Sequence, residues 1–492
     1  MNEPPMHKPV SSEPAAIFCM ALALALLMTS CGSIRDNADR SLEGRPQTSD
    51  ILASHTALGT AILRSTAVAS INQPYTTIRT GLAVLWNRPR ELVTGNTPIP
   101  LKLSHKNPQH APGTPGFEAE LDAIGCPPVE WGKIRWLVDG DQFFPELDRM
   151  LANSRAQIDV QIFIFDNDDI ATRYADRLRM LSATRKVRVL FDDLGTTAAQ
   201  GAAPETPAPA GFTPPDDMKR YLTDGSNVRV RRILNPWFVC DHTKLFVIDR
   251  SSALLGGMNI GREYFSEWHD LMLRVDGPVV ATLARDFNRA WRKAGPLGDL
   301  ALIRRPARTI TPPPRINGDV PLRVLRTDPA AGVHDIHEAT VLSIRAARKR
   351  IWIQNPYVAH DGIVRELAQA AKRGVDVRVI IPGKGDSAIM GGGNAVTAAF
   401  LIKAGVRVYR YPGMTHMKVM IADGWAQAGS ANIDALSLRI NRELNIAVSD
   451  PATVRALEKS VFQPDFRRST LIRESEVPPL TGHLAEIIAD QL

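Results

Sequence analysis

His242-Thr243-Lys244-Leu245-Phe246-Val247-Ile248-Asp249 is followed, after six intervening residues, by Gly256-Gly257-Met258-Asn259. The same pattern returns as His416-Met417-Lys418-Val419-Met420-Ile421-Ala422-Asp423, followed by Gly429-Ser430-Ala431-Asn432. Side chains two apart on a strand project to the same face, so each histidine lies on one side of its strand together with its lysine. A lone His-x-Lys on a strand is a weak signal. Two copies with the same order and nearly the same spacing indicate that a single motif has been duplicated.

The sequence around the two motifs is repeated as well. Ile158-Asp159-Val160-Gln161 lines up with Ile351-Trp352-Ile353-Gln354, and Val187-Arg188-Val189-Leu190 with Val377-Arg378-Val379-Ile380. Strands that alternate with helices predict a parallel or mixed sheet, and we therefore expect an α/β protein built from two related halves. The predicted helices are 144–155, 169–182, 336–348 and 362–373, and the predicted strands are 158–165, 187–191, 351–357 and 375–381.

Composition and proline placement set the predicted domain boundaries. Pro306 and Pro312-Pro313-Pro314 can continue neither a helix nor a central strand, so this stretch is predicted to link the halves. A second proline-rich stretch, 204–215, is predicted to be a loop within the first half. The predicted segments are a signal peptide (1–30), a tether and unassigned region (31–130), the first half (131–303), the linker (304–318), the second half (319–470) and a C-terminal tail (471–492).

The paired motif supplies the groups that a displacement at a phosphodiester needs. If the halves pack about a pseudo-twofold axis, His242 and His416 converge on one pocket with Lys244 and Lys418. One imidazole can attack phosphorus, while the other protonates the leaving oxygen and later deprotonates the incoming alcohol or water. The lysines offset charge on the phosphoryl oxygens. Further candidates for phosphate binding are Asn259, Ser430 and Asn432.

Two carboxylates downstream of the motifs are candidates for orienting the histidines. Asp270 follows His242 by 28 residues, and Glu443 follows His416 by 27. The spacing within the two motifs differs by the same one residue, so Asp270 and Glu443 occupy equivalent positions in the two halves. A carboxylate on the far ring nitrogen fixes the tautomer and orientation of an imidazole and stabilises its cationic form.

Asp249 and Asp423 complete the catalytic motif, and we expect each to anchor its strand, because an aspartate at a strand end is usually a turn or ion-pair residue. A metal site is the alternative use of histidine and aspartate. A protonated lysine at the centre of each motif cannot ligate a metal, so we expect no metal and no cofactor.

The motif residues closely resemble the signature of the phospholipase D superfamily, the second copy in particular as His416-x-Lys418-x4-Asp423-x5-Gly429-Ser430-x-Asn432-x-Asp434. The resemblance extends from about Trp136 to Asp465. Within the superfamily the sequence is most similar to bacterial cardiolipin synthases, on three stretches: residues 256–264, 268–270 and 432–441.

The resemblance implies a duplicated α-β-α sandwich with mixed sheets, two halves related by a pseudo-twofold axis and an active site at their interface. It also implies catalysis through a phosphohistidine. By resemblance His242 is the nucleophile, His416 is the acid and base, and Lys244 and Lys418 bind phosphate. The sequence by itself does not fix which histidine attacks.

The overall composition favours anionic partners. Lys and Arg outnumber Asp and Glu by 59 to 52, a formal charge of +7 with a pI near 9.3. Such a balance suits phospholipid surfaces or nucleic acid. Apolar residues make up 44% and charged residues 23%, which excludes wholesale disorder. A single apolar run excludes a polytopic membrane protein.

The first thirty residues are typical of an export signal. Lys8 precedes the apolar run Ala15 to Met28, and small residues then lead to Cys31-Gly32. The segment resembles a bacterial lipoprotein signal, with lipid attached to Cys31; an ordinary signal peptide and an uncleaved anchor are the alternatives. Because no aspartate follows the cysteine, the resemblance implies an exported, membrane-anchored lipoprotein at the periplasmic face of the outer membrane.

The leading functional hypothesis is phosphatidyl transfer between phospholipids, such as the joining of two phosphatidylglycerols into cardiolipin. Its near alternative is a hydrolytic phospholipase D that releases phosphatidic acid. A phosphodiesterase acting on nucleic acid and a non-catalytic lipid-binding protein are more distant alternatives. We see no basic run interleaved with aromatic residues, so the expected partners are a phospholipid substrate and a membrane surface, and nucleic acid is disfavoured.

Overall fold

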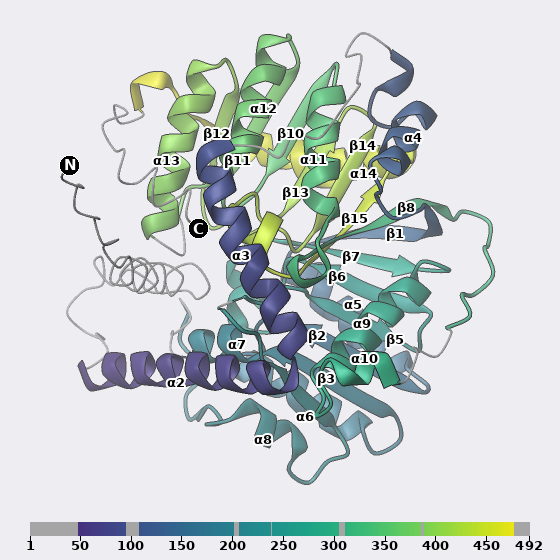
Figure 1. Ribbon diagram of the computed structural model, residues 1–492, viewed down its shortest axis with the longest axis vertical. Coiled ribbons are helices and arrows are strands. Elements are labelled where there is room, and N and C mark those ends of the chain that lie inside the picture. Colours follow the sequence, from purple (N-terminus) through teal and green to yellow (C-terminus); the bar gives the residue numbers. More distant parts are fainter. Residues whose placement is uncertain are drawn as a thin grey trace, which may run out of the picture.

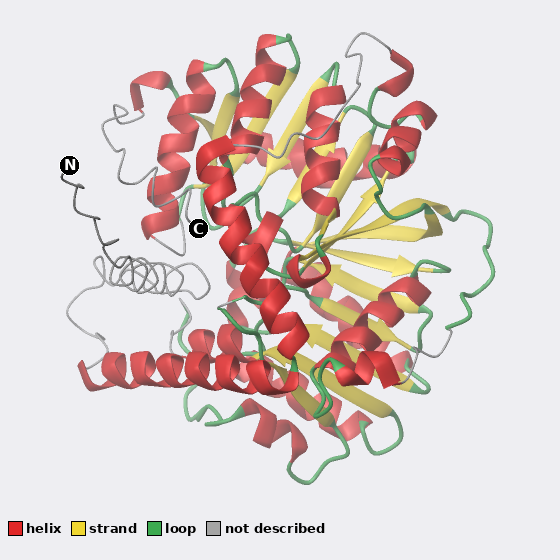
Figure 2. Ribbon diagram, viewed as in Figure 1, coloured by secondary structure: helices red, strands yellow, loops and turns green. Residues whose placement is uncertain are grey.

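The computed structural model describes residues 48–94, 108–200, 206–237, 239–304, 310–384 and 388–476. The predicted signal peptide, Cys31 and most of the predicted C-terminal tail lie outside these ranges. Helices and strands alternate along most of the described chain, as Figures 1 and 2 show. The described residues therefore form a mixed α/β protein.

Sixteen strands are present among the described residues, seven before the linker and nine after it. In the first half they are β1 (Glu130–Val138), β2 (Gln157–Ile162), β3 (Lys186–Asp192), β4 (Arg229–Ile233), β5 (Leu245–Ile248), β6 (Ser252–Gly256) and β7 (Leu271–Asp276). In the second half they are β8 (Val320–Asp328), β9 (Val333–His334), β10 (Arg350–Gln354), β11 (Asp376–Pro382), β12 (Arg407–Tyr411), β13 (Val419–Ala422), β14 (Trp425–Gly429), β15 (Glu443–Val448) and β16 (Thr470–Leu471).

The order of the strands shows the duplication directly. The first half runs β4-β3-β2-β5-β6-β7-β1, and the second runs β12-β11-β10-β13-β14-β15-β8 in the same order. In the first half β2 pairs in parallel with β3 and antiparallel with the motif strand β5. In the second half β10 pairs in the same way with β11 and with the motif strand β13. An antiparallel pairing of β1 with β8 joins the halves into one sheet. The predicted mixed sheets and duplicated architecture are confirmed.

Helices cover the sheets on both faces (Figure 2). The elements predicted from periodicity are α5 (Asp139–Asn153), α6 (Asp169–Leu181), α11 (Asp335–Ala346) and α12 (Asp361–Lys372). The remaining α-helices of the described residues are α2 (Thr48–Asn72), α3 (Pro74–Thr94), α4 (Pro115–Ala123), α7 (Asp193–Gln200), α8 (Met218–Thr223), α9 (Val280–Lys293), α10 (Leu300–Arg304), α13 (Ala388–Lys403), α14 (Pro451–Leu457) and α15 (Gln463–Arg468).

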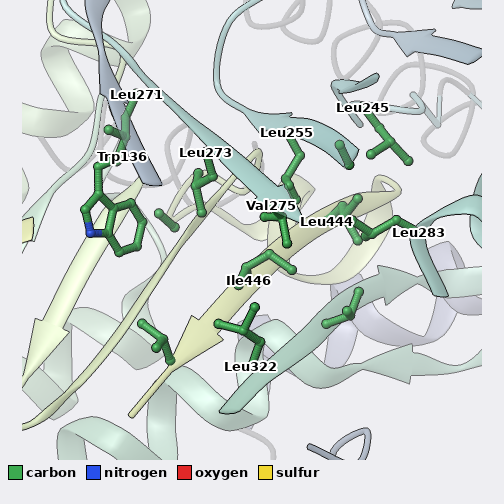
Figure 3. Close-up of a cluster of buried hydrophobic side chains, with 14 of the residues drawn as sticks. Trp136, Leu245, Leu255, Leu271, Leu273, Val275, Leu283, Leu322, Leu444 and Ile446 are labelled. Carbon is green, nitrogen blue, oxygen red and sulfur yellow. The ribbon is translucent and has the colours of Figure 1, made fainter. Parts of the chain in front are cut away.

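Three large apolar clusters explain the layering. One joins α5 and α6 to the outer face of the first half, and another joins α11 and α12 to the outer face of the second. The third lies between the halves: it contains residues of β5, β6, β7 and α9 from the first half together with residues of β13, β14, β15 and α14 from the second (Figure 3). Because both halves contribute to this central cluster, burying it fixes how the two motif strands face each other.

Local sequence explains where the elements begin. The side chain of Asp168 accepts a hydrogen bond from the backbone N–H of Ala171 and so caps α6. The motif strands β5 and β13 are buried along their whole length, which suits their continuous apolar sequences.

The region before residue 130, which the sequence left unassigned, contains helices that pack on the body of the molecule. Arg64 of α2 makes an ion pair with Asp193 at the start of α7. Phe117 of α4 packs edge to face on Trp425 of β14, with ring centroids 5.9 Å apart. No helix in the described part of the chain has a stretch long and apolar enough to cross a bilayer.

Candidate active site

The two predicted His–Lys pairs lie at the starts of the motif strands, at the junction of the halves. Lys244 and Lys418 are almost completely buried, and each donates a hydrogen bond from Nζ to the carbonyl oxygen of its own histidine, at 2.9 and 2.5 Å. The lysine of the other half also acts electrostatically on each histidine: Lys418 lowers the pKa of His242, and Lys244 lowers the pKa of His416. The structure thus brings the four predicted residues together.

A buried carboxylate contacts Nδ1 of each imidazole, and the contacts cross between the halves. Oε1 of Glu443 lies 3.0 Å from Nδ1 of His242. Oδ2 of Asp270 lies 2.6 Å from Nδ1 of His416. The sequence relates each carboxylate by spacing to the histidine of its own half, whereas the structure places it on the histidine of the other half. Neither half by itself contains an oriented histidine.

Backbone pairing explains the crossing around His242. The backbone N–H of His242 donates to the carbonyl oxygen of Arg442 at 2.9 Å, which brings the residue before Glu443 alongside the motif. Asp241 and Arg442 form a parallel β-bridge, and their side chains form an ion pair at 2.7 Å. Both are the immediate predecessors of the crossed pair, so the bridge holds the carboxylate in register with the imidazole.

The same arrangement recurs around His416. Its backbone N–H donates to the carbonyl oxygen of His269 at 2.7 Å, and His269 forms a parallel β-bridge with Thr415. His269 precedes Asp270, just as Arg442 precedes Glu443. The pseudo-twofold relationship therefore extends from the sheets to the hydrogen bonds of the site.

Burial controls the protonation of the site. It lowers the pKa of His242 and of His416 well below the ordinary value, and the two nearby lysines lower both further. Burial also lowers the pKa of Lys244 to about 7. Without an anion present, both imidazoles are neutral at pH 7.

Burial has the opposite effect on the two carboxylates. It raises the pKa of Glu443 to about 8 and that of Asp270 to about 6, against the lowering effect of the lysines. A phosphate entering the pocket supplies the negative charge that favours the cationic forms of histidine and lysine.

The environment of His242 fixes its tautomer. Besides Glu443, the carbonyl oxygen of Ser430 lies 3.1 Å from Nδ1, and a carbonyl oxygen can only accept a hydrogen bond. Nδ1 of the neutral ring therefore carries the proton, and the lone pair is on Nε2. Within the described residues, no hydrogen bond engages Nε2 of His242 or of His416. These nitrogens are available to a substrate.

Small residues of the motif tails make room for the carboxylates. A Cβ on Gly257 would lie 2.2 Å from Oδ1 of Asp270, so glycine is required at this position. Ser430 occupies the equivalent position of the second half, where its hydroxyl donates to Oε2 of Glu443 at 2.5 Å. The structure thus gives Ser430, a predicted phosphate ligand, a carboxylate as the partner of its hydroxyl.

The two asparagines predicted to bind phosphate have different environments. Oδ1 of Asn259 accepts from the backbone N–H of Ile164 at 3.0 Å, and its Nδ2 donates to the hydroxyl of Tyr264 at 2.9 Å. Oδ1 of Asn432 is buried and has no hydrogen-bond partner among the described residues. Asn259 is thus held by the protein at both ends of its amide.

Asp249 and Asp423 bind backbone at the far end of the motif strands. The carboxylate of Asp249 accepts from three successive N–H groups, residues 155–157, at 2.7 to 2.8 Å. Asp423 does the same with residues 348–350 at 2.8 to 2.9 Å. Burial opposes the charge of Asp249, but these hydrogen bonds outweigh it and lower the pKa. The geometry is that of the anchoring role expected from the sequence.

A comparison with protein families identifies the chain. Residues 147–291 and 341–463 match the family model described as cardiolipin synthase, PLD-like domain. These two ranges contain both motifs and both carboxylates. The chain belongs to the phospholipase D superfamily.

Individual relatives agree with this membership. Cardiolipin synthase A of Pseudomonas entomophila (strain L48) is 30% identical over 356 residues, covering 68% of each chain. Cardiolipin synthase A of Pseudomonas aeruginosa (strain LESB58) is 30% identical over 369 residues, covering 73% of this chain and 71% of the relative. The crystal structure of phosphatidylserine synthase from Haemophilus influenzae Rd KW20 shares the fold, with a TM-score of 0.58 at 14% identity over 76% of this chain and 100% of the other. The predicted superfamily, and an enzyme of that superfamily, are confirmed.

In this phospholipase D superfamily member, His269 is an important residue for the site that sequence reasoning did not single out. Its Nδ1 lies 2.7 Å from Asp139 of the first half, and its Nε2 lies 2.8 Å from Asp465 of the second. The ring stacks on Tyr411 with centroids 4.6 Å apart. Burial alone would lower the pKa of His269, but the two carboxylates raise it to about 9. The sequence signal that could have identified His269 is its position next to Asp270.

Aromatic rings complete the walls around the two imidazoles. Phe163 lies edge to face against His242 at 4.7 Å between centroids, and its ring lies 5.0 Å from Nζ of Lys244. Tyr264 and Trp268 flank His416 at 5.7 and 5.1 Å. Both Tyr264 and Trp268 are buried, so they belong to the wall of the site and not to the surface.

Proposed function

We propose that this enzyme transfers a phosphatidyl group between phospholipids through a phosphohistidine, joining two phosphatidylglycerol molecules into cardiolipin with release of glycerol. The observation that carries the proposal is the crossed site: His242 and His416 are each oriented by a carboxylate of the other half, with Lys244 beside them. The matching family and both relatives are cardiolipin synthases by name, which supports this choice of substrate.

In the first step, Nε2 of His242 attacks phosphorus of the donor lipid. The P–N bond forms, the bond from phosphorus to the head-group glycerol oxygen breaks, and Nε2 of His416 gives its proton to that oxygen. His416 must be cationic to do this. The bound phosphodiester anion favours that state by placing negative charge beside the imidazole, and Asp270 stabilises it from behind.

In the second step, a hydroxyl of the second phosphatidylglycerol attacks the same phosphorus. Its proton goes to Nε2 of His416, the new P–O bond forms, and the P–N bond breaks to restore His242. Lys244 and Lys418 offset the charge of the pentacoordinate phosphoryl group in both steps. The free lone pair on Nε2 supports His242 as the nucleophile, since its Nδ1 proton is held by two acceptors.

Product analysis by mass spectrometry tests the proposal. Full-length protein in detergent is incubated with phosphatidylglycerol, beside His242→Ala, His416→Ala and the control His110→Ala, which changes a half-buried histidine outside the site. The expected result is cardiolipin and free glycerol from the native and control proteins, and neither from the two active-site variants. Phosphatidic acid as the sole product would make the enzyme a hydrolase instead. No lipid product from any of the four would favour the nuclease or the non-catalytic alternative.

We further propose that the chain is exported and anchored as a lipoprotein through Cys31, at the periplasmic face of the outer membrane. The support is the sequence alone: an apolar run and small residues immediately before Cys31-Gly32. Labelling cells with a radioactive fatty acid tests this directly. Label should enter the native protein and not Cys31→Ala, and equal labelling of both would contradict lipidation at this residue.

A further inference from the structure

The helix α3 (Pro74–Thr94) and the corner before it have an unusual distribution of side chains. The outward face consists of Ile71, Tyr75, Ile78, Leu82 and Leu85, each 61 to 78% exposed. We call these five residues the apolar face. The inward face consists of Gln73, Thr76, Thr77 and Thr80, each 2 to 7% exposed. A surface helix normally turns its apolar stripe inward and its polar side to water, so α3 is inverted.

Specific contacts fix this inverted orientation. The side chain of Asp299 accepts from the hydroxyl of Thr76 at 2.6 Å and from its backbone N–H at 2.9 Å. The carbonyl oxygen of Thr77 accepts from Nε1 of Trp237 at 2.9 Å. These contacts hold Thr76 and the backbone of Thr77 against the body of the molecule, although Oγ1 of Thr77 and Oε1 of Gln73 have no hydrogen-bond partner among the described residues. Rotating the helix to bury its apolar face would break the hydrogen bonds of Thr76 and of the Thr77 carbonyl. The outward apolar face is therefore a property of the fold.

The apolar face lies above the loops that lead to the active site. On the inner side of α3, Val84 packs on Val239, Leu436 and Ile440. Val239 is three residues before His242, and Ile440 is three residues before Glu443, so α3 touches the approach to the site from both halves. Figure 1 shows α3 crossing the front of the molecule over the junction of the halves.

Trp237 extends the apolar face toward the first motif. It is 42% exposed, and its indole lies so close to α3 that a Cβ on Gly81 would come within 3.0 Å of Nε1. Its φ of 60° is a strained conformation for a bulky residue. Such strain persists when the surrounding structure requires it, and here it holds an indole at the surface five residues before His242.

The charge around the apolar face suits an anionic surface. Residues 57–85 contain two basic residues, Arg64 and Arg79, and no acidic residue. Arg64 is paired with Asp193, whereas Arg79 is exposed beside the hydroxyl of Tyr75, 3.0 Å away. An exposed apolar stripe with tyrosine, tryptophan and arginine is the composition of a segment that lies at a lipid–water interface.

We propose that the apolar face of α3, extended by Trp237, docks on the surface of a bilayer containing anionic phospholipid. This inference rests on the proposed function, because an enzyme that joins phospholipids must meet them in a membrane. Docking here would bring the approach to His242 and His416 against the bilayer. A coiled coil with a second copy is less well supported, since the stripe covers about two heptads where three to four are typical, and Pro74 interrupts it.

Vesicle sedimentation tests the proposal on the full-length chain. All proteins carry Cys31→Ala, so that lipidation cannot mask the effect, and His242→Ala, so that binding is measured without turnover. The test variant is Tyr75→Gln, Ile78→Gln, Leu82→Gln and Leu85→Gln together. The matched control replaces four apolar residues exposed elsewhere, Met180, Ile316, Phe400 and Leu471, by glutamine. Vesicles contain phosphatidylglycerol and phosphatidylcholine, or phosphatidylcholine alone.

We expect the test variant to bind phosphatidylglycerol vesicles at least about tenfold more weakly than the parent, with the control unchanged and binding to phosphatidylcholine alone weaker throughout. Equal binding of test variant and parent overturns the proposal. If equal binding is accompanied by a change from dimer to monomer in light scattering, the apolar face is an interface with a second copy of the chain. If equal binding is accompanied by a clear loss of thermal stability, another part of the chain covers the apolar face.

The outcome is separable from that of the proposed function. Because binding is measured on an inactive background, a loss of binding supports docking even if the native enzyme forms no cardiolipin. In the active background, the test variant should form product normally from a short-chain phosphatidylglycerol dispersed below its micelle concentration, and slowly from vesicles. Equal turnover on vesicles would contradict docking while leaving the proposed function intact.

Discussion

Oε1 of Glu443 lies 3.0 Å from Nδ1 of His242, although the two residues are 201 positions apart and belong to different halves of the molecule. The equivalent contact, between Asp270 and His416, crosses in the opposite direction at 2.6 Å. Each half therefore supplies one histidine for chemistry and one carboxylate to position the other histidine. A site built this way exists only when both halves are docked, which ties activity to the central apolar cluster.

The crossing predicts which histidine each carboxylate controls. In ¹⁵N NMR spectra of the histidine rings, Glu443→Gln should change the tautomer signals of His242 and leave those of His416 in place. Asp270→Asn should do the reverse. Both variants should lower kcat, by about 10²–10⁴, because an amide no longer stabilises the required tautomer and charge.

Assignment of the two signals through His242→Ala and His416→Ala provides the control. If Glu443→Gln perturbed His416 and spared His242, the carboxylates would act within their own halves and the crossed arrangement would be wrong.

Lys244 gives the enzyme a pH dependence that can be checked. Burial lowers the pKa of its ammonium group to about 7, so the group is charged below that pH and neutral above it. A charged lysine favours binding of the phosphodiester anion. We expect kcat/KM on mixed micelles to fall as pH rises above about 7, since this parameter reports groups of the free enzyme.

Lys244→Arg separates this effect from other titrations. A guanidinium stays charged throughout the range, so the variant should lose the falling limb, even with a lower rate at pH 6.5. If kcat/KM of Lys244→Arg still falls above about pH 7, the titration of another group causes the fall.

The anchoring contacts of Asp249 predict a loss of stability without a loss of chemistry. Asp249→Asn keeps the size of the side chain but removes the charge from three backbone hydrogen bonds. We expect urea unfolding to show a decrease of about 1.5–3 kcal/mol, with specific activity per folded molecule preserved. Asp423→Asn, at the equivalent position, should behave alike. Normal stability with a collapse of kcat would instead place the carboxylate in the reaction.

His269 predicts a stability that falls at alkaline pH. Asp139 and Asp465 outweigh burial and hold its pKa at about 9 in the folded protein, above the ordinary value of 6.5. The resulting stabilisation is complete below pH 6.5 and is lost as pH rises toward 9, by about 3 kcal/mol. The loss of stability caused by His269→Asn should therefore be larger at pH 6 than at pH 9.5, by about 3 kcal/mol. An unchanged difference in unfolding free energy across this range would show that the histidine is neutral.

The strands and helices around the motifs were predictable because their sequences repeat and their apolar residues recur with clear periods. The predicted helix 169–182 is α6, Asp169–Leu181, and the predicted strand 375–381 is β11, Asp376–Pro382. The candidate site residues were found for the same reason, since duplication turns a weak His-x-Lys signal into a strong one.

The crossing could not be predicted, because spacing along the chain says nothing about which half a carboxylate reaches. The backbone bridges that decide it join residues about 150 to 200 positions apart, such as Asp241 and Arg442. The N-terminal helices escaped prediction for a different reason. In α3 the threonines face inward and the large apolar side chains face outward, against the pattern on which the prediction of a core relies.

The measurement that tests the crossed, two-histidine site most directly is mass spectrometric mapping of the covalent intermediate. The native protein is mixed with a short-chain phosphatidylglycerol and quenched at alkaline pH, where phosphohistidine survives, beside His242→Ala and His416→Ala. We predict a phosphatidyl group on the peptide containing His242 in the native protein, and none in either variant, because His416 supplies the proton for the leaving glycerol. An adduct on His416, or cardiolipin formed by His242→Ala, would contradict the mechanism.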